Sequence, residues 1–350
     1  MLLIIRDTES VKSEIYPLAQ TYEAWDLRFG IFTIREKWEL ILGQNAIETE
    51  KGLEFSNFPE NKSIPGSSIP SLEMNTAELA AIEQYLTPIN SVTDILDHQT
   101  NSFLSDFAWI QKNRTSQTIS TTCQVINEAA IFIEEGAELT YAILNAANGP
   151  IYIGKNANVM EGTCIRGPFA MGERAVVKMG TRIYPNTFIG NETVVGGELK
   201  NTTIQDYSNK GHDGYLGDAI IGQWCNLGAG TSASNVKNNA GDVRIWSKKD
   251  QQFVSTGLKR GLIMGDYSKA AINTSFNTGT LVGVACNVFT SGLTPKYIPD
   301  FSWGVSNEQL YDIEKLTVDI ESWKKFKNKT LTTKEKQELA RIFERNLNHL

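Results

Sequence analysis

The chain has 350 residues, 41% of them hydrophobic and 21% charged, which is the composition of an ordinary globular protein. Its formal net charge of −7, without a cluster of Lys and Arg, argues against a nucleic-acid-binding surface, because phosphates must be neutralised by basic side chains. The apolar runs are shorter than the roughly 20 residues that a membrane-spanning helix needs. We therefore expect neither nucleic acid nor a membrane among the partners.

The start of the chain and its cysteines bear on the compartment. The first residues, MLLIIRDTES, are apolar and then acidic, which predicts a buried strand and not a signal peptide. The cysteines lack metal-ligand spacing, and a chain of this length needs no disulfide bonds; they are Cys123, Cys164, Cys225 and Cys286. We expect reduced thiols, no metal site and a cytoplasmic location.

The glycines divide the chain into regions. Residues 1–110 contain four glycines, residues 111–304 contain 24, and residues 305–350 contain none. A compositional step of this kind marks domain boundaries. We predict a small α/β domain over 1–115, a repeat domain over 116–304 and a helical C-terminal cap over 305–350.

The first region has the signals of a small α/β unit. Leu2–Ile5 is a candidate strand. Thr33 and Glu36 have the spacing of a capping box ahead of an amphipathic helix. Asn75 and Glu78 repeat this device before a helix that should end near residue 86.

The repeat domain is defined by aliphatic residues at six-residue intervals. The period holds in one phase at Ile153, Val159, Ile165, Met171, Val177, Ile183, Ile189 and Val195. Neither the helical period of 3.6 nor the strand period of 2 explains it. A hexapeptide period indicates a solenoid of short strands, in which each hexad buries one inward aliphatic side chain. The fold class is therefore mainly β, a parallel β-helix.

The period is imperfect on both sides of this run. The early coils mix two phases, one through Val125, Ile131 and Ile143 and the other through Ile133 and Leu139. The phase breaks between Val195 and Ile221, and residues 235–242 form a polar loop. The period resumes at Ile221 and Leu227, before this loop, and continues after it at Met264, Ala270, Phe276, Val282 and Val288.

The last region should form two helices. Ile313, Leu316, Ile320 and Trp323 share one helical face, and Thr332 with Glu335 caps a second helix. Because repeat arrays need capped ends, we expect these helices to pack on the last coils.

His212 is the strongest candidate for chemistry. It is one of three histidines, and it lies in the segment 209–218, where the six-residue phase breaks. Loops held on a rigid scaffold are favoured places for catalysis. We expect His98, in a polar stretch, to be a solvated surface residue, and His349 lies next to the C-terminus.

The residues around His212 resemble a known enzyme family. Lys200, Lys210-Gly-His212, Tyr215-Leu-Gly-Asp-Ala219 and Asn226-Leu-Gly-Ala-Gly-Thr231 are similar to a block in the acetyltransferase half of the bifunctional N-acetylglucosamine-1-phosphate uridyltransferase / glucosamine-1-phosphate acetyltransferase. The whole chain also resembles a group of bacterial proteins described as sugar nucleotidyltransferases. Gly149-Pro-Ile-Tyr-Ile-Gly154 and Arg166-Gly-Pro-Phe169 carry that second likeness.

The resemblance implies a left-handed β-helix and assigns roles to single residues. His212 matches the general base that takes a proton from the amine of the sugar, and Asn235 matches an asparagine near that base. The remaining matches are sugar-phosphate ligands at Lys200, Tyr215, Asn226 and Arg182, and a coenzyme A contact at Ala229. Enzymes of this kind are typically trimers, so a homotrimer is implied.

The chemistry of these residue types agrees with acyl transfer. An amine must lose its proton to attack a thioester, and an imidazole is suited to accept that proton at neutral pH. Lys200 and Arg182 would give charge-assisted bonds to a phosphate. A backbone amide within 227–230 is a candidate donor to the oxyanion. The leading hypothesis is transfer of an acetyl group from acetyl-coenzyme A to an amino sugar phosphate or a nucleotide-linked amino sugar.

Two other hypotheses remain open at this stage. The first is a sugar-1-phosphate nucleotidyltransferase, which alone would call for Mg²⁺. Its Gly-x-Gly-Thr-Arg signature is missing, because the matching stretch, Ile5 to Ser10, contains no glycine, so the N-terminal domain resembles a degenerate nucleotidyltransferase. The second is a solenoid without catalytic activity that binds a sugar nucleotide. In that case Asn226 would only satisfy hydrogen bonds in a turn of the solenoid, and Tyr215 would only pack against neighbouring side chains.

Overall fold

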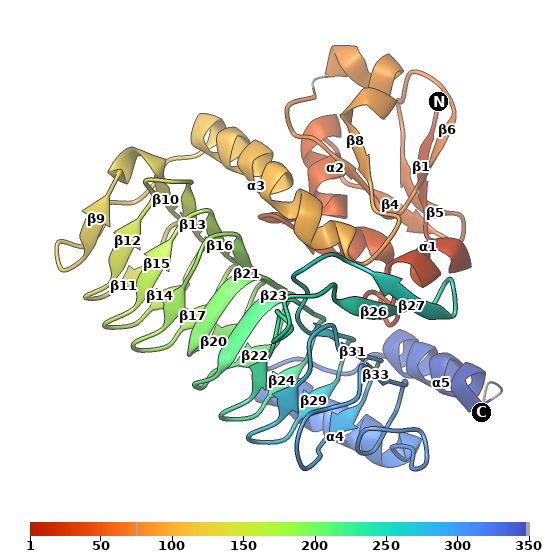
Figure 1. Ribbon diagram of the computed structural model, residues 1–350. Coiled ribbons are helices and arrows are strands. Elements are labelled where there is room, and N and C mark those ends of the chain that lie inside the picture. The colour runs from red at the N-terminus through yellow and green to blue at the C-terminus, as the bar shows by residue number, and fades with distance from the viewer. Residues whose placement is uncertain (75, 348–350) are drawn as a thin grey trace.

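The computed structural model describes all residues except 75 and 348–350, so the expected cap at Asn75 and the position of His349 lie outside the described residues. It confirms the predicted fold class: a left-handed parallel β-solenoid of about 10 turns, with a small α/β domain before it and helices after it (Figure 1). In the described part of the chain, none of the helices has the length and apolarity to cross a bilayer.

The N-terminal domain is built on a four-stranded sheet of order β4-β5-β1-β6. Its strands are β1 (Leu3–Arg6), β4 (Ile47–Thr49), β5 (Gly52–Phe55) and β6 (Lys62–Pro65), with the pairs β2 (Arg28–Phe29)/β3 (Phe32–Thr33) and β7 (Ser68–Pro70)/β8 (Leu86–Pro88) beside it. Its helices are α1 (Glu9–Glu14), α2 (Ile34–Leu42) and α3 (Asp94–Asn113), and 3₁₀ turns span Ala24–Asp26 and Thr76–Tyr85. The predicted capping box of Thr33 and Glu36 starts α2.

The solenoid is a prism with three faces, because each coil contributes one short strand to each face. Face 1 consists of β10 (Ile131–Ile133), β13 (Ile151–Ile153), β16 (Phe169–Met171), β19 (Thr187–Ile189), β28 (Ile263–Met264), β31 (Leu281–Val282) and β33 (Tyr297–Ile298). Face 3 consists of β9 (Gln124–Ile126), β12 (Ile143–Asn145), β15 (Cys164–Arg166), β18 (Arg182–Ile183), β25 (Ser232–Ala233) and β30 (Ser275–Phe276). The long strands β21 (Glu198–Ile204) and β23 (Tyr215–Ile221) bend from face 3 into face 1.

Face 2 lies between these two and forms a separate sheet of eight strands. They are β11 (Glu138–Leu139), β14 (Asn158–Val159), β17 (Val176–Val177), β20 (Val194–Val195), β22 (Asn209–Lys210), β24 (Asn226–Leu227), β29 (Lys269–Ala270) and β32 (Asn287–Val288). The second residue of every one of these strands points inward and is buried. This ladder is the structural origin of the six-residue period.

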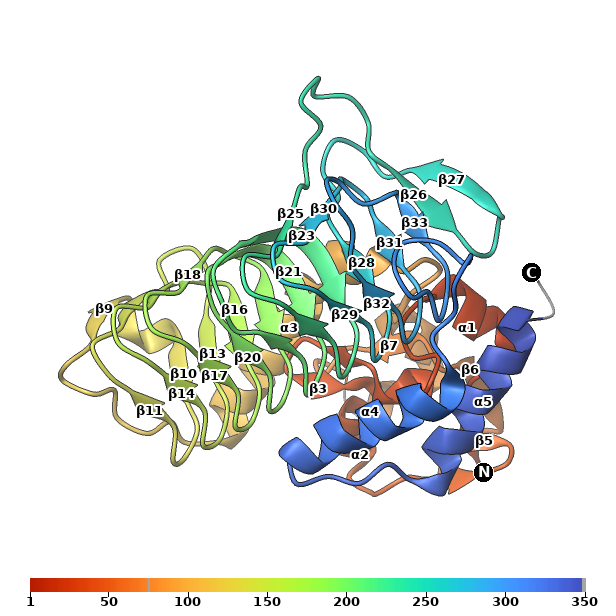
Figure 2. The same cartoon turned by 90° about the horizontal axis from the view of Figure 1, so that it is seen from below.

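Two surfaces of the prism are covered, as the two views show (Figures 1 and 2). Apolar side chains of α3 pack on outward residues of face 1, where Phe103 and Phe188 lie with ring centroids 5.1 Å apart. Helices α4 (Ile313–Phe326) and α5 (Thr333–Leu347) pack on aromatic residues at the corners between faces 1 and 2, such as Trp224 and Tyr267. These contacts leave face 3 and its corner with face 2 uncovered, and helix α4 stands opposite part of face 2 across a groove.

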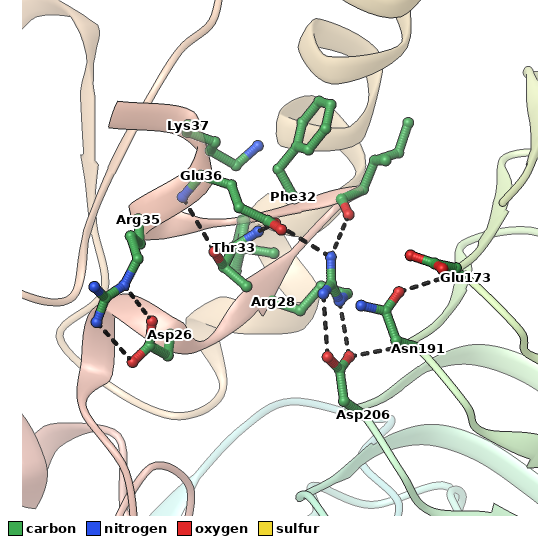
Figure 3. A network of polar contacts seen from close by, with 12 residues as sticks. Asp26, Arg28, Phe32, Thr33, Arg35, Glu36, Lys37, Glu173, Asn191 and Asp206 are labelled. Atoms are coloured by element: carbon green, nitrogen blue, oxygen red, sulfur yellow. Dashed lines mark hydrogen bonds and ion pairs between the residues drawn. The ribbon is translucent and has the colours of Figure 1, made fainter. Parts of the chain in front are cut away.

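A buried ion pair joins the N-terminal domain to the solenoid (Figure 3). The guanidinium of Arg28 donates to both oxygens of Asp206, at 2.8 and 3.1 Å, and to the carbonyl of Ile31 at 2.6 Å. Asp206 also accepts from the backbone N–H of Asn191 at 2.9 Å. Because both partners of such a pair are removed from water, loss of either leaves a costly buried charge.

Three features differ from the sequence-based expectations. Helix α3 was not predicted. A hairpin of β26 (Arg244–Ser247) and β27 (Gln252–Ser255) extends the predicted polar loop between β25 and β28. The phase of the second coil is shifted by one residue, because Leu144 is buried while Ile143 is 40% exposed. A shift of one residue on a strand moves a side chain to the opposite face.

Candidate functional site

His212 lies on a corner between faces 2 and 3 that departs from the repeat. Regular corners there contain four residues between the two strands, as in 160–163, 178–181, 228–231 and 271–274. His212 belongs to such a corner, 211–214, but the corner in the preceding coil contains only Gly196 and Gly197. The phase break in the sequence is therefore a shortened turn immediately below the histidine.

The short corner explains its two glycines. A Cβ atom on Gly196 would lie 2.9 Å from the carbonyl oxygen of Gly211. A Cβ atom on Gly197 would lie 2.9 Å from the carbonyl oxygen of His212, in a residue that already has φ of +80°. Only glycine lets the two corners approach so closely, because it has no side chain and tolerates the left-handed region.

The hydrogen bonding between corners also changes at His212. Elsewhere the third N–H of a corner donates to the second carbonyl of the preceding corner, as Gly180 does to Glu161 at 3.0 Å and Asn273 to Ala229 at 2.7 Å. At the histidine this bond moves by one residue, since the N–H of Gly230 donates to Asp213 at 3.1 Å. The carbonyl of His212 is thereby released from the regular ladder.

The imidazole of His212 is exposed on a groove of about 550 Å³. The solenoid side of the groove is formed by face 2 and its corner, and the opposite side by helix α4. The lining residues are Lys178, Val194, Asn209, Gly211, His212, Asn226, Leu227, Ser322, Trp323 and Phe326. A mostly apolar concave surface with a few polar groups is the usual form of a small-molecule site.

Of the residues predicted from sequence, the groove brings together His212 and Asn226. Asn226 stands outward on face 2 directly above Asn209, so two side-chain amides share one face of the prism. The sequence reasoning missed Lys178, Trp323 and Phe326. Lys178 contributes a cation, and its side chain lies over the Cα of Gly211, where a Cβ would meet Lys178 Cε at 3.4 Å.

Tyr215 and Asn235 form a second group, on the face-3 side of the histidine. Tyr215 is half-buried, and its hydroxyl lies over Gly217. Burial raises the pKa of Tyr215, and the nearby carboxylate of Asp218 adds to this effect. Asp218 is 6% exposed and accepts hydrogen bonds from the side chains of Asn201, at 2.6 Å, and Asn235. Asp218 therefore fixes the orientation of Asn235.

The remaining predicted residues are spread along the prism. Lys200 is exposed on β21 and is paired in register with Gly217. Arg182 is exposed on face 3, where its Nε donates to Glu198 at 3.3 Å. Ala229 lies on the next corner, and its carbonyl accepts from Asn273. Within one chain, these three side chains do not line the groove that His212 lines.

The described residues contain no group of three or more His, Cys, Asp and Glu side chains that could hold a metal ion. Acidic partners also engage two arginines of the N-terminal domain. Arg28 binds Asp206, and Arg35 binds Asp26 at 2.6 Å and Glu48 at 2.9 Å. Neither guanidinium is therefore available to a phosphate without breaking an ion pair.

Comparisons with known proteins place the chain near a family of transferases. The bifunctional protein GlmU of Methanocaldococcus jannaschii is 32% identical over 139 residues, which are 40% of this chain and 33% of that protein. GlmU of Buchnera aphidicola is 25% identical over 232 residues, 52% of this chain and 51% of that protein. A bifunctional sugar-1-phosphate nucleotidylyltransferase/acetyltransferase of Sulfurisphaera tokodaii is 26% identical over 152 residues, 38% of each chain. The chain thus spans between a third and about half of the length of these relatives.

No protein-family model matches the chain. A solved structure of an Arabidopsis UDP-N-acetylglucosamine acyltransferase covers 58% of this chain and 77% of its own, at 15% identity and a TM-score of 0.28, which is too low to support any argument. The curated relatives are transferases, and the acetyltransferase half of the bifunctional proteins is the part that the solenoid fits.

Proposed function

We propose that the protein is an acyltransferase that moves an acetyl group from acetyl-coenzyme A to the amine of an amino sugar phosphate or of a nucleotide-linked amino sugar. His212 is the general base of this reaction. The supporting observation is the exposed imidazole of His212 on a groove of about 550 Å³, above a corner shortened to two glycines. The likeness to the bifunctional transferases supports the same class of reaction.

The proposed step is a balanced acyl transfer. The amine nitrogen attacks the thioester carbonyl carbon and loses a proton to the imidazole of His212. The tetrahedral intermediate then collapses, the carbon–sulfur bond breaks, and the thiolate of coenzyme A leaves with the proton that the imidazolium returns. The products are an N-acetylated sugar and free coenzyme A. A backbone N–H within 227–230 is the proposed donor to the oxyanion.

The groove is the proposed place for part of the donor. Two outward amides, Asn209 and Asn226, offer hydrogen bonds, and Val194, Trp323 and Phe326 offer apolar surface. This lining is compatible with the pantetheine arm of coenzyme A, which is a thin chain with secondary amides. Ala229, on the corner above His212, is the proposed further contact of coenzyme A.

The separation of the proposed ligands favours a homotrimer. Tyr215, Lys200 and Arg182 lie toward face 3, whereas Asn226 lies on face 2, so a neighbouring copy on the shared corner would complete the site. Large apolar side chains are exposed along this corner: Tyr141 is 64%, Met179 71% and Ile272 69% exposed. Such rows mark interaction surfaces. Sedimentation equilibrium should give three times the chain mass of 38.9 kDa, and a monomer would refute the proposed trimer.

The proposed location is the cytoplasm. The four cysteines are free, and two of them, Cys225 and Cys286, are buried in the prism. Free thiols are the usual state in reducing compartments.

The base is tested by replacing His212 with Ala and measuring acetyl transfer to a panel of amino sugar phosphates. We expect the turnover of H212A to fall by about 10² to 10⁴ fold, the range for loss of a general base. The matched control is His98→Ala, on helix α3. Undiminished turnover in H212A would remove His212 from the mechanism.

The bifunctional nature of the relatives favours one second candidate, nucleotidyl transfer by the N-terminal domain. Its test uses the full chain, because residues of α3 cover apolar side chains of face 1 such as Phe188. The full chain is incubated with a nucleoside triphosphate, a sugar 1-phosphate and Mg²⁺. Release of pyrophosphate that persists in H212A would establish this second activity.

A further inference from the structure

A lysine occupies the interior of the prism at His212. Every other face-2 strand places an aliphatic residue at its second, inward position, including Val195 and Leu227 in the adjacent coils. At this position β22 has Lys210, which is 1% exposed and in register with Val195. Burial lowers the pKa of Lys210 to about 8, against an opposing effect of Asp213. Burying an ammonium group costs free energy unless hydrogen bonds satisfy it, so Lys210 must have acceptors inside the prism.

Those partners are the carbonyl groups of the irregular corners. Nζ of Lys210 donates to the carbonyl oxygen of His212 at 2.5 Å and lies 3.5 Å from that of Gly196. The carbonyl of His212 is the one that the shifted bond between Gly230 and Asp213 leaves outside the regular ladder. The ammonium thus takes the place of the missing backbone donor.

The same corner has an altered backbone. In regular corners the third residue has a left-handed conformation, with φ of +68° at Gly180, +74° at Gly230 and 57° at Asn273. In the corner of His212 it is the fourth residue, Gly214, with φ of +130°. The carbonyl of His212 turns inward to Lys210 while the imidazole stays exposed on the groove.

We propose that Lys210 is a positioning residue for His212, which binds the carbonyl of the histidine from inside the prism and so fixes the direction in which the imidazole enters the groove. The importance of this direction for turnover rests on the proposed function. The contact itself does not. A misplacement of about 1 Å in a catalytic group can cost about 10² fold in rate, so a device of this kind has a measurable effect.

The test compares Lys210→Met with the unmodified chain, both labelled with ¹³C at the histidine Cε1 position. The chain has three histidines, so the spectrum contains three signals. We expect the signal of His212 in K210M to shift toward the value of a free side chain and to sharpen, while that of His98 on α3 stays unchanged. Turnover should fall at least tenfold, with the KM of the sugar within twofold of its original value.

The matched control is Leu216→Met, an inward residue on face 3 that is 1% exposed and whose apolar side chain has no donor for the carbonyl of His212. L216M should leave both the spectrum and the turnover unchanged. A His212 signal in folded K210M identical to that of the unmodified chain would overturn the inference. It would show that Lys210 only satisfies a buried carbonyl.

A measurement on the unmodified chain covers the case in which K210M fails to fold. Relaxation of the ¹³C-labelled imidazole should give His212 an order parameter near the rigid value of about 0.85, and one below about 0.6 would overturn the inference. The general-base role of His212 and the positioning role of Lys210 can be refuted independently. If H212A keeps its turnover, the general base is wrong, whereas the spectral effect of K210M still decides the role of Lys210.

Discussion

The coils before His212 and the coils around it share the arrangement of three strands per turn, but they differ in their corners and in their inward residues. From Ile153 to Val195 each hexad adds one aliphatic side chain to a continuous core, and the corners between faces 2 and 3 contain four residues. Around His212 one corner is shortened to Gly196 and Gly197, and a lysine replaces the aliphatic residue. The regular coils contribute apolar burial to stability, whereas the irregular coil contributes polar groups to the groove.

A departure from a repeat is informative because the neighbouring coils show which residue is expected at each position. A stacked repeat repeats its backbone, so a polar group in an inward position has a specific local cause. At Lys210 the cause is the carbonyl of His212. Substitutions in the two kinds of coil can test this division of roles.

Gly214→Ala should be the most damaging single change. Gly214 has φ of +130°, and a Cβ there would lie 2.0 Å from the carbonyl oxygen of Thr231 in the next coil. Backbone strain of about 1–3 kcal/mol and overpacking of about 1–3 kcal/mol together predict a loss of about 2–6 kcal/mol in the free energy of unfolding. Urea denaturation measures this loss, and acetyl transfer should fall with it.

The matched control is Gly180→Ala, in a regular corner. Gly180 has φ of +68°, but a Cβ there would meet nothing within 4 Å. We expect only the left-handed penalty, about 1–2 kcal/mol, and unchanged turnover. Equal losses in the two variants would mean that the corner of His212 is no more tightly packed than a regular one.

Ile153→Ala tests the regular coils. Ile153 is fully buried in the ladder of the prism, and an Ile→Ala change in a core costs about 2–5 kcal/mol. We expect thermal and urea denaturation to report this loss, while turnover per folded molecule at 20 °C stays within twofold. A large drop in turnover without a change in stability would contradict the division between the two kinds of coil.

Sequence alone predicted the solenoid because its aliphatic ladder is periodic, yet it misassigned the second coil. There the segment between β11 and β12 contains three residues, 140–142, instead of four, so the inward Leu144 follows Leu139 by five positions and not six. Ile143 was assigned inward because it continues the six-residue series through Val125 and Ile131. Helix α3 had a local signal that was overlooked, because Phe103, Phe107 and Ile110 are spaced by four and three residues and are all buried. What the sequence could not predict is its packing on aromatic residues of face 1 that are remote in the chain.

The site was predictable in part. His212 stood out because the phase breaks around it, and Lys210 had a signal that was overlooked: Ile204, Lys210 and Leu216 are six residues apart and all point inward. The helix side of the groove had no such signal. Trp323 was assigned to a buried helical face and Phe326 to none, and only the packing of α4 against the solenoid brings them opposite His212.

Stability should depend on pH through a carboxylate at the corner between faces 1 and 2. Burial raises the pKa of Asp266 to about 7, although the N–H of Gln223 donates to it at 3.0 Å. The folded state then holds a proton that the unfolded state releases near pH 4. The free energy of unfolding should therefore decrease as pH rises from about 4 to 7, by at most about 1.4 kcal/mol per pH unit, and level off above. In Asp266→Asn this slope should be lost, and at pH 8 the variant should be about 1–4 kcal/mol more stable.

Asp206→Asn is the control for that experiment. Asp206 has the equivalent position in a corner of an earlier coil, but its negative charge is neutralised by Arg28. Removing its charge leaves the guanidinium buried and unpaired, so we expect a loss of about 3–5 kcal/mol. If both asparagine variants changed stability in the same direction at pH 8, the prediction that the charge of Asp266 destabilises the folded state would be wrong.

The smallest effect is expected at the wall of the groove. Phe326 is 79% exposed and lines the groove opposite His212, so Phe326→Ala should leave the melting temperature unchanged. A ligand that packs on the ring would lose about 0.5–1.5 kcal/mol, which corresponds to a rise of about twofold to twelvefold in its KM. Val318→Ala is the control, because Val318 is 61% exposed on the same helix and does not line the groove. Turnover at saturating substrate should be unaffected. A fall in kcat with constant KM would instead place the ring of Phe326 at the reacting atoms. No change in either constant would mean that the ligand binds elsewhere on the prism.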